Sequence, residues 1–135
     1  ELDMIDAVTS VETIPPTAEW GSAHYTFNDG ARVYLDVNCA HWHTSKGAAN
    51  TSGLYLDYNE KDLQTLDVFK PPIAAVRGSG NLDFNIVPGK PDKSIFIFRM
   101  ESTDPGILMP ESGRKMVHKE GVALIRDWIL SLEDN

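Results

Sequence analysis

The feature that most constrains this chain is a short stretch, residues 39–43, which holds its only cysteine and two of its four histidines. The stretch directly follows residues 31–38, where apolar side chains recur with the spacing of one helical face. Because residues four apart lie on the same face of a helix, Cys39 and His43 are expected to point to the same side. A soft sulfur and an imidazole presented together are typical ligands of a redox metal or a metal-containing cofactor.

Length and composition limit the class of protein to which this stretch can belong. The chain has 135 residues, which is enough for one domain with a core of its own, and 41% of them are hydrophobic. No apolar run approaches the roughly 18 residues that a membrane span requires. The net charge of −8 argues against binding to nucleic acid, whose phosphates need clustered lysine and arginine. We therefore expect a globular domain with no membrane span and no nucleic-acid partner.

The rest of the chain predicts a mostly α-helical fold. Residues 1–30 are interpreted as an N-terminal extension, and residues 31–135 as the domain itself. Helices are expected at 31–38, continuing into the Cys39 stretch, in one or two turns within 61–69, from Pro91 to about Met100, and at 117–132. About four helices joined by long loops are therefore predicted, and such loops usually line a site or wrap a cofactor.

Several separated motifs give this chain a family resemblance. Trp42 stands where a second cysteine would complete C-x-x-C-H, the attachment signature of c-type haem. Further segments agree in kind and order with bacterial c-type cytochrome domains: Lys-Pro-Pro at 70–72, Gly-Ser-Gly at 78–80, Pro-Gly-Lys-Pro at 88–91, Ser-Thr-Asp-Pro-Gly at 102–106, Met-Pro at 109–110 and Val-His-Lys-Glu-Gly at 117–121. From Tyr34 to Leu132 the chain therefore resembles a class I c-type cytochrome whose attachment motif has become C-x-x-W-H.

The resemblance implies a set of site residues. It makes His43 the proximal and Met109 the distal ligand of a haem iron, and it lets Cys39 form a single thioether to the haem. It makes Arg77 a partner for a haem propionate and places Trp42 in the space beside the cofactor.

The resemblance also implies how the surrounding segments lie. The loops at 48–53 and 77–80 would lie against the haem. The last helix would cross the first, with Trp128 packing near Tyr34 or Val37.

Other uses of the same residues stay open because Trp42 removes one of the two sulfurs. The haem could be bound without a covalent bond through the same two axial ligands. A haem-free domain could instead bind copper through Cys39, His43 and Met109, joined by His41 or another histidine. A third possibility is a cofactor-free interaction domain.

The function that the resemblance implies is electron transfer by a single redox centre. The chain contains no G-x-S-x-G elbow and no glycine-rich phosphate loop, so hydrolase and nucleotide-binding interpretations lack support and we expect no enzyme activity. The resemblance implies a redox partner protein and a periplasmic or secreted location. It also allows for a place in a larger multidomain chain.

Overall fold

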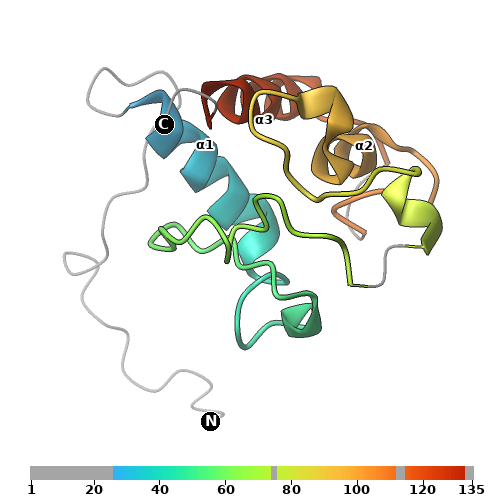
Figure 1. The fold of residues 1–135 in the computed structure, drawn as a ribbon, viewed down its shortest axis with the longest axis horizontal. Coiled ribbons are helices and arrows are strands. Elements are labelled where there is room, and N and C mark those ends of the chain that lie inside the picture. Colours follow the sequence, from blue (N-terminus) through green and yellow to red (C-terminus); the bar gives the residue numbers. More distant parts are fainter. Residues whose placement is uncertain (1–25, 74–75, 112–114, 133–135) are drawn as a thin grey trace, which may run out of the picture.

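A computed structural model describes residues 26–73, 76–111 and 115–132. Within these ranges it has three α-helices, α1 (Phe27–Leu35), α2 (Ile95–Glu101) and α3 (Lys119–Ser131), and no β-strand (Figure 1). Long loops with short 3₁₀ turns connect the helices. The prediction of a small, mostly helical domain with long loops is confirmed.

The structure has three α-helices in its described residues rather than about four, because residues 61–69 form turns instead of a helix. Asp67 and Phe69 have positive φ angles of 60° and 54°. These angles belong to the left-handed region, which no residue of an α-helix can adopt.

The first helix begins earlier than the sequence indicated. Thr26 caps it, because the Thr26 hydroxyl accepts a hydrogen bond from the Asp29 N–H (3.1 Å) and the Asp29 carboxylate accepts one from the Thr26 N–H (2.9 Å). This reciprocal capping box satisfies two backbone donors that a helix start would otherwise leave unpaired. Residues 27–30, assigned to the extension on sequence grounds, therefore belong to the first helix.

The same helix changes its hydrogen-bonding pattern before it ends. Residues Asp36–Ala40 form a π-helical turn, which is wider than the α-helix that precedes it. Single π turns within α-helices are rare and occur frequently at functional sites. Here the π turn carries Cys39.

Helices α1 and α3 cross in an antiparallel sense. Near the start of α1, the indole N–H of Trp128 donates to the side-chain oxygen of Asn28 (2.9 Å). Near its end, the Tyr34 ring stacks on His118 with 5.6 Å between ring centroids, and a Cβ on Gly121 would overlap that ring. The expected crossing is present, but Trp128 bonds near the opposite end of α1 from Tyr34, and Val37 is exposed.

The three helices share one hydrophobic core with the loop segments between them. In Figure 1, α2 lies beside α3, and the described loops of residues 41–73 gather at the end of α1. The buried members of this core are Ala31, Leu35, Ala40, Leu54, Leu56, Leu66, Ile86, Ile97, Met100, Val122, Ile125, Trp128 and Ile129. Loops therefore supply a large part of the core.

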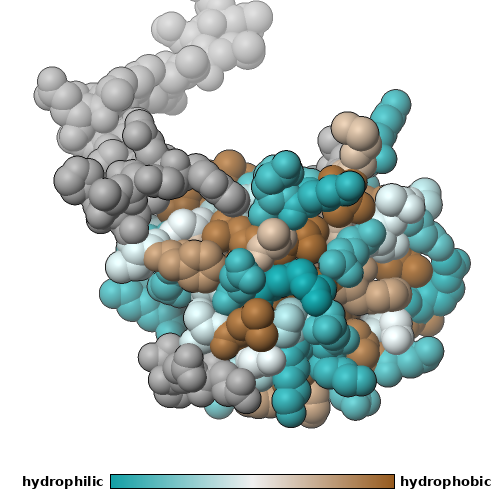
Figure 2. Space-filling view, turned by 90° about the horizontal axis from the view of Figure 1, so that it is seen from above, coloured by the Kyte–Doolittle hydropathy of each residue, from teal (hydrophilic) through white to brown (hydrophobic). Residues whose placement is uncertain are grey.

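The surface carries both hydrophobic and hydrophilic side chains. On the face shown in Figure 2, hydrophobic groups are interspersed with hydrophilic ones. None of the helices in the described ranges has the length and hydrophobicity needed to cross a membrane.

Candidate cofactor cavity

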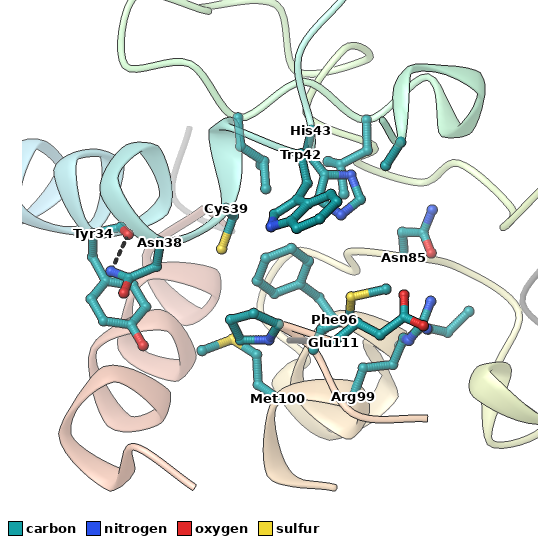
Figure 3. Close-up of a pocket in the computed structure, with 16 residues that line it drawn as sticks. Tyr34, Asn38, Cys39, Trp42, His43, Asn85, Phe96, Arg99, Met100 and Glu111 are labelled. Atoms are coloured by element: carbon teal, nitrogen blue, oxygen red, sulfur yellow. Dashed lines mark hydrogen bonds between the residues drawn. The ribbon is translucent and has the colours of Figure 1, made fainter. Parts of the chain in front are cut away.

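A cavity of about 420 Å³ opens beside the end of α1. Its volume falls within the range of about 300–1,000 Å³ that is typical of ligand sites. In Figure 3, Trp42 and His43 lie on one side of the cavity and Phe96, Met100 and Arg99 lie on the opposite side. Sixteen residues line it: Tyr34, Asn38, Cys39, Trp42, His43, Ala49, Leu54, Leu56, Asn85, Ile95, Phe96, Arg99, Met100, Met109, Pro110 and Glu111.

Four of the six predicted site residues line this single cavity. Cys39, Trp42 and His43 come from the end of the first helical segment, while Met109 comes from the loop between α2 and α3. These two parts of the chain are more than sixty residues apart in sequence. The fold thus brings the predicted sulfur, imidazole and thioether groups to one place.

The other two predicted residues lie elsewhere. His41 is exposed, and its ring packs against that of Trp42 (5.5 Å between centroids) outside the cavity lining. Arg77 is also exposed and pairs with Asp104 (2.6 Å). The loop at 77–80 that contains Arg77 packs on α2, since the backbones of Gly78 and Gly80 contact Arg99 and Phe98. It does not line the cavity.

The end of the first helical segment orients His43. The His43 N–H donates to the Cys39 carbonyl (2.9 Å), a bond of α-helical spacing that keeps the two residues on one turn. The His43 carbonyl in turn accepts from the Leu56 N–H (2.9 Å). The backbone of His43 is therefore fixed from both sides.

The contacts of Ser52 favour one tautomer of the His43 ring. The Ser52 hydroxyl donates to the Ala49 carbonyl (2.7 Å), and its oxygen lies 3.4 Å from His43 Nδ1. Since that hydroxyl proton is already used, the oxygen can only accept, which puts the imidazole proton on Nδ1 and leaves the lone pair on Nε2. Burial, assisted by the positive charge of Arg99, lowers the pKa of His43 and so keeps the ring neutral.

Cys39 is a thiol in this environment. Burial raises the pKa of its sulfur to about 12. At neutral pH the sulfur is therefore protonated, and it is the single cysteine of the chain. It has no partner for a disulfide within this protein.

Met109 is held by a compact turn that begins at Asp104. The backbone N–H groups of Ile107 and Leu108 both donate to the Asp104 carbonyl (2.9 and 2.8 Å), and the Met109 N–H donates to the Arg99 carbonyl (3.0 Å). Arg77 contributes here through its ion pair with Asp104, which anchors the turn from outside.

A cluster of charged and polar residues reaches the cavity lining through Asn85. Asp67 is fully buried and accepts from the Asn85 amide (2.7 Å), and Lys70 Nζ lies 2.9 Å from its other oxygen. Lys70 Nζ also donates to the Gly53 carbonyl (3.1 Å). Gly53 has a φ of 71°, and a Cβ there would lie 2.6 Å from Lys70 Nζ. Of the small-residue loop 48–53, only Ala49 reaches the cavity lining.

Two cavity residues escaped the sequence interpretation, Arg99 and Glu111. They are the one cation and the one carboxylate among the described residues that line the cavity. An arginine in the middle of the apolar segment Ile95–Glu101 is a signal that could have been read, because a charged residue on a buried helix needs a partner. Glu111 directly follows Met109-Pro110, but nothing in its local pattern sets it apart.

The described residues contain no group of three or more histidine, cysteine, aspartate or glutamate side chains placed to hold a metal ion. Comparison with models of known protein families, with curated proteins and with solved structures finds no match to this chain. The chemistry of the cavity is therefore inferred from its own residues.

Proposed function

We propose that this domain is a single-centre electron carrier of the class I cytochrome c type, with a haem bound in the cavity. His43 and Met109 would be the axial ligands, and Cys39 would hold the haem through one thioether. The observation that carries the proposal is that all three side chains, from two distant parts of the chain, line one cavity. A helix end that supplies cysteine and histidine, and a later loop that supplies methionine, is the arrangement that the resemblance implies.

The donor set suits a haem. The Nε2 lone pair of His43 can coordinate iron, and a thioether sulfur from methionine is a known second ligand of c-type haem. The other lining residues are mostly apolar, which suits a porphyrin, and Arg99 supplies a positive charge for an acidic group. A His/Met pair raises the reduction potential of such a haem.

The protein's own part in this function is structural and electrostatic. The Ser52 contact and the Leu56 bond orient His43, the turn at Asp104 places Met109, and apolar walls keep the centre dry. Trp42 is 41% exposed at the cavity, so the centre would have one edge near the surface for electron exchange. We further propose a redox partner protein and a periplasmic or secreted location.

Copper is the second candidate occupant. Cys39, His43 and Met109 are also copper ligand types, but mononuclear redox copper usually takes two histidines, and His41 lies outside the cavity lining. A cavity of about 420 Å³ is also far larger than one ion needs. These observations favour haem.

The first test is to mix the purified protein with iron protoporphyrin IX and to record the absorption spectrum from 250 to 800 nm. We expect a Soret band at one haem per chain, with low-spin bands in both oxidation states. His43→Ala and Met109→Leu should each convert the spectrum to high-spin form, because each removes an axial ligand.

Two variants serve as matched controls for this test. His41→Ala and Met116→Leu change the same residue types at exposed positions and should leave the spectrum unchanged. Copper near one per chain together with no Soret band would favour the copper alternative, whereas no binding of either would favour an interaction domain. A haem that stays with the chain after denaturation would assign the thioether to Cys39.

A further inference from the structure

The cavity holds one positive and one negative side chain at the same place. Arg99 lies on α2, and Glu111 lies two residues after Met109 in the loop between α2 and α3. Both residues line the cavity, and Figure 3 shows the Glu111 side chain extending towards Arg99. Burial lowers the pKa of Arg99, and the negative charge of Glu111 opposes that lowering, so the two charges act on each other.

The Arg99 guanidinium is fixed within a built site. Its Nε donates to the Ile107 carbonyl (2.9 Å), which sets the plane of the group. The buried backbone of Gly78 covers it, since a Cβ there would lie 3.3 Å from the guanidinium carbon. A residue larger than Gly78 would therefore occupy the space that the Arg99 guanidinium fills.

A planar guanidinium held in this way suits a carboxylate, with which it forms charge-assisted hydrogen bonds. Glu111 carries such a carboxylate on the lining of the same cavity. It differs from Arg99 in being exposed and in lying on a loop, so it can leave without disturbing the core. By contrast, Arg99 is half-buried and tied to Ile107.

We propose that Glu111 is an internal competitor for the Arg99 guanidinium, and that a carboxylate on the occupant of the cavity displaces it. Arg99 then selects occupants that carry an acid group, and Glu111 weakens their binding because its own attraction to Arg99 is lost when the occupant takes its place. This inference rests on the proposed function, in which the occupant is a haem and the acid group is a propionate. It also assigns to Arg99 the propionate contact that the resemblance implies for Arg77.

The test compares iron protoporphyrin IX with its dimethyl ester, which has the same ring but no free carboxylate. Each is titrated into the full chain and followed by the Soret band. We expect the diacid to bind about 10- to 100-fold more tightly, the size of effect typical of a hydrogen bond to a charged group. Glu111→Gln should tighten binding of the diacid several-fold and leave the diester unchanged.

Two arginine variants complete the comparison. Arg99→Gln should abolish the preference for the diacid, and Arg77→Gln, a matched change at the exposed Asp104 pair, should keep it. If Arg99→Gln does not fold, the Glu111→Gln result still decides the matter. Equal affinity of the wild-type protein for the two porphyrins, or an equal effect of Glu111→Gln on both, would overturn the inference.

A fluorescent medium-chain fatty acid and its methyl ester separate this inference from the proposed function. If neither porphyrin binds but the acid binds better than its ester, and Glu111→Gln strengthens the acid, the haem proposal fails and the role of Arg99 stands. If a porphyrin binds without any preference for its free acid, the haem proposal stands and the proposed role of Arg99 fails.

Discussion

Gly121→Val is expected to destabilise the protein by about 3 kcal/mol, at the upper end of the usual cost of overpacking. Gly121 lies in the first turn of α3, where any Cβ would overlap the hydroxyl and ring of Tyr34. Tyr34 cannot move aside without loss, because it stacks on His118 and its hydroxyl lies 3.1 Å from His118 Nδ1. Tyr34 also lines the cavity, so a shift of its ring away from α3 could take it into that space.

The measurement for Gly121→Val is urea unfolding at pH 7, followed by circular dichroism. Gly30→Val is the matched control, because Gly30 also lies within a helix but a Cβ there meets nothing within 4 Å. That variant should stay within about 0.5 kcal/mol of the wild type, since valine and glycine differ little in helix propensity. Equal stability of the two variants would contradict the close crossing of α1 and α3. A Tyr34 ring pushed into the cavity should also weaken the haem binding that we propose.

Lys70→Met is expected to cost about 2–3 kcal/mol at pH 7. Removing one partner of a buried ion pair costs about 3–5 kcal/mol, because the other charge is left without compensation. Here the lysine side chain is 35% exposed, so solvent screening reduces the effect. The buried carboxylate of Asp67 would keep only its bond to Asn85.

The pH dependence of this variant has a definite sign. Burial raises the pKa of Asp67 above its ordinary value of 3.8, and Lys70 opposes that rise. A group with a raised pKa binds its proton more tightly in the folded protein, so its contribution to stability is greatest at acid pH and is lost as the pH rises through the folded pKa. Since Lys70→Met raises this pKa further, its cost should be smaller at pH 4 than at pH 7.

The double variant Asp67→Asn/Lys70→Met is the control for the ion pair. It removes both charges, and asparagine tolerates the positive φ of position 67 better than most residues do. Its stability should return to within about 1 kcal/mol of the wild type, because replacing both members of a buried pair is often nearly neutral. A double variant as unstable as Lys70→Met alone would show that the charges themselves are needed.

Local patterns in the sequence predicted the three α-helices of the described residues but not their limits. The apolar spacing of α3 predicted a helix at 117–132, and the structure has it at Lys119–Ser131. Thr26 was not recognised as a cap, because both Thr26 and its partner Asp29 precede residue 31, where the sequence predicted the helix to begin. The turns at 61–69 were missed because nothing in the local spacing shows that two non-glycine residues take left-handed angles.

The sequence predicted those residues of the candidate site that lie in the motifs of the family resemblance. Cys39, Trp42, His43 and Met109 follow from the resemblance, and the structure gathers them at one cavity. Arg77 was predicted because the resemblance places the loop at 77–80 against the haem, whereas the fold pairs Arg77 with Asp104. The position of Arg99 within an apolar segment was a signal in the sequence, but its place at the cavity depends on the packing of Gly78 and on the turn that ends at Met109.

The π turn at Asp36–Ala40 has a consequence for the angular register of the cavity residues. A regular α-helix advances by about 100° per residue, and a π turn accommodates one extra residue within a turn without passing on that rotation. The wider turn therefore lets Asp36–Ala40 carry one more residue while His43 keeps its register with the helix that precedes it. Loss of one residue from the turn should convert it to an ordinary α-turn, which would leave the direction of His43 unchanged and displace the backbone that carries Cys39.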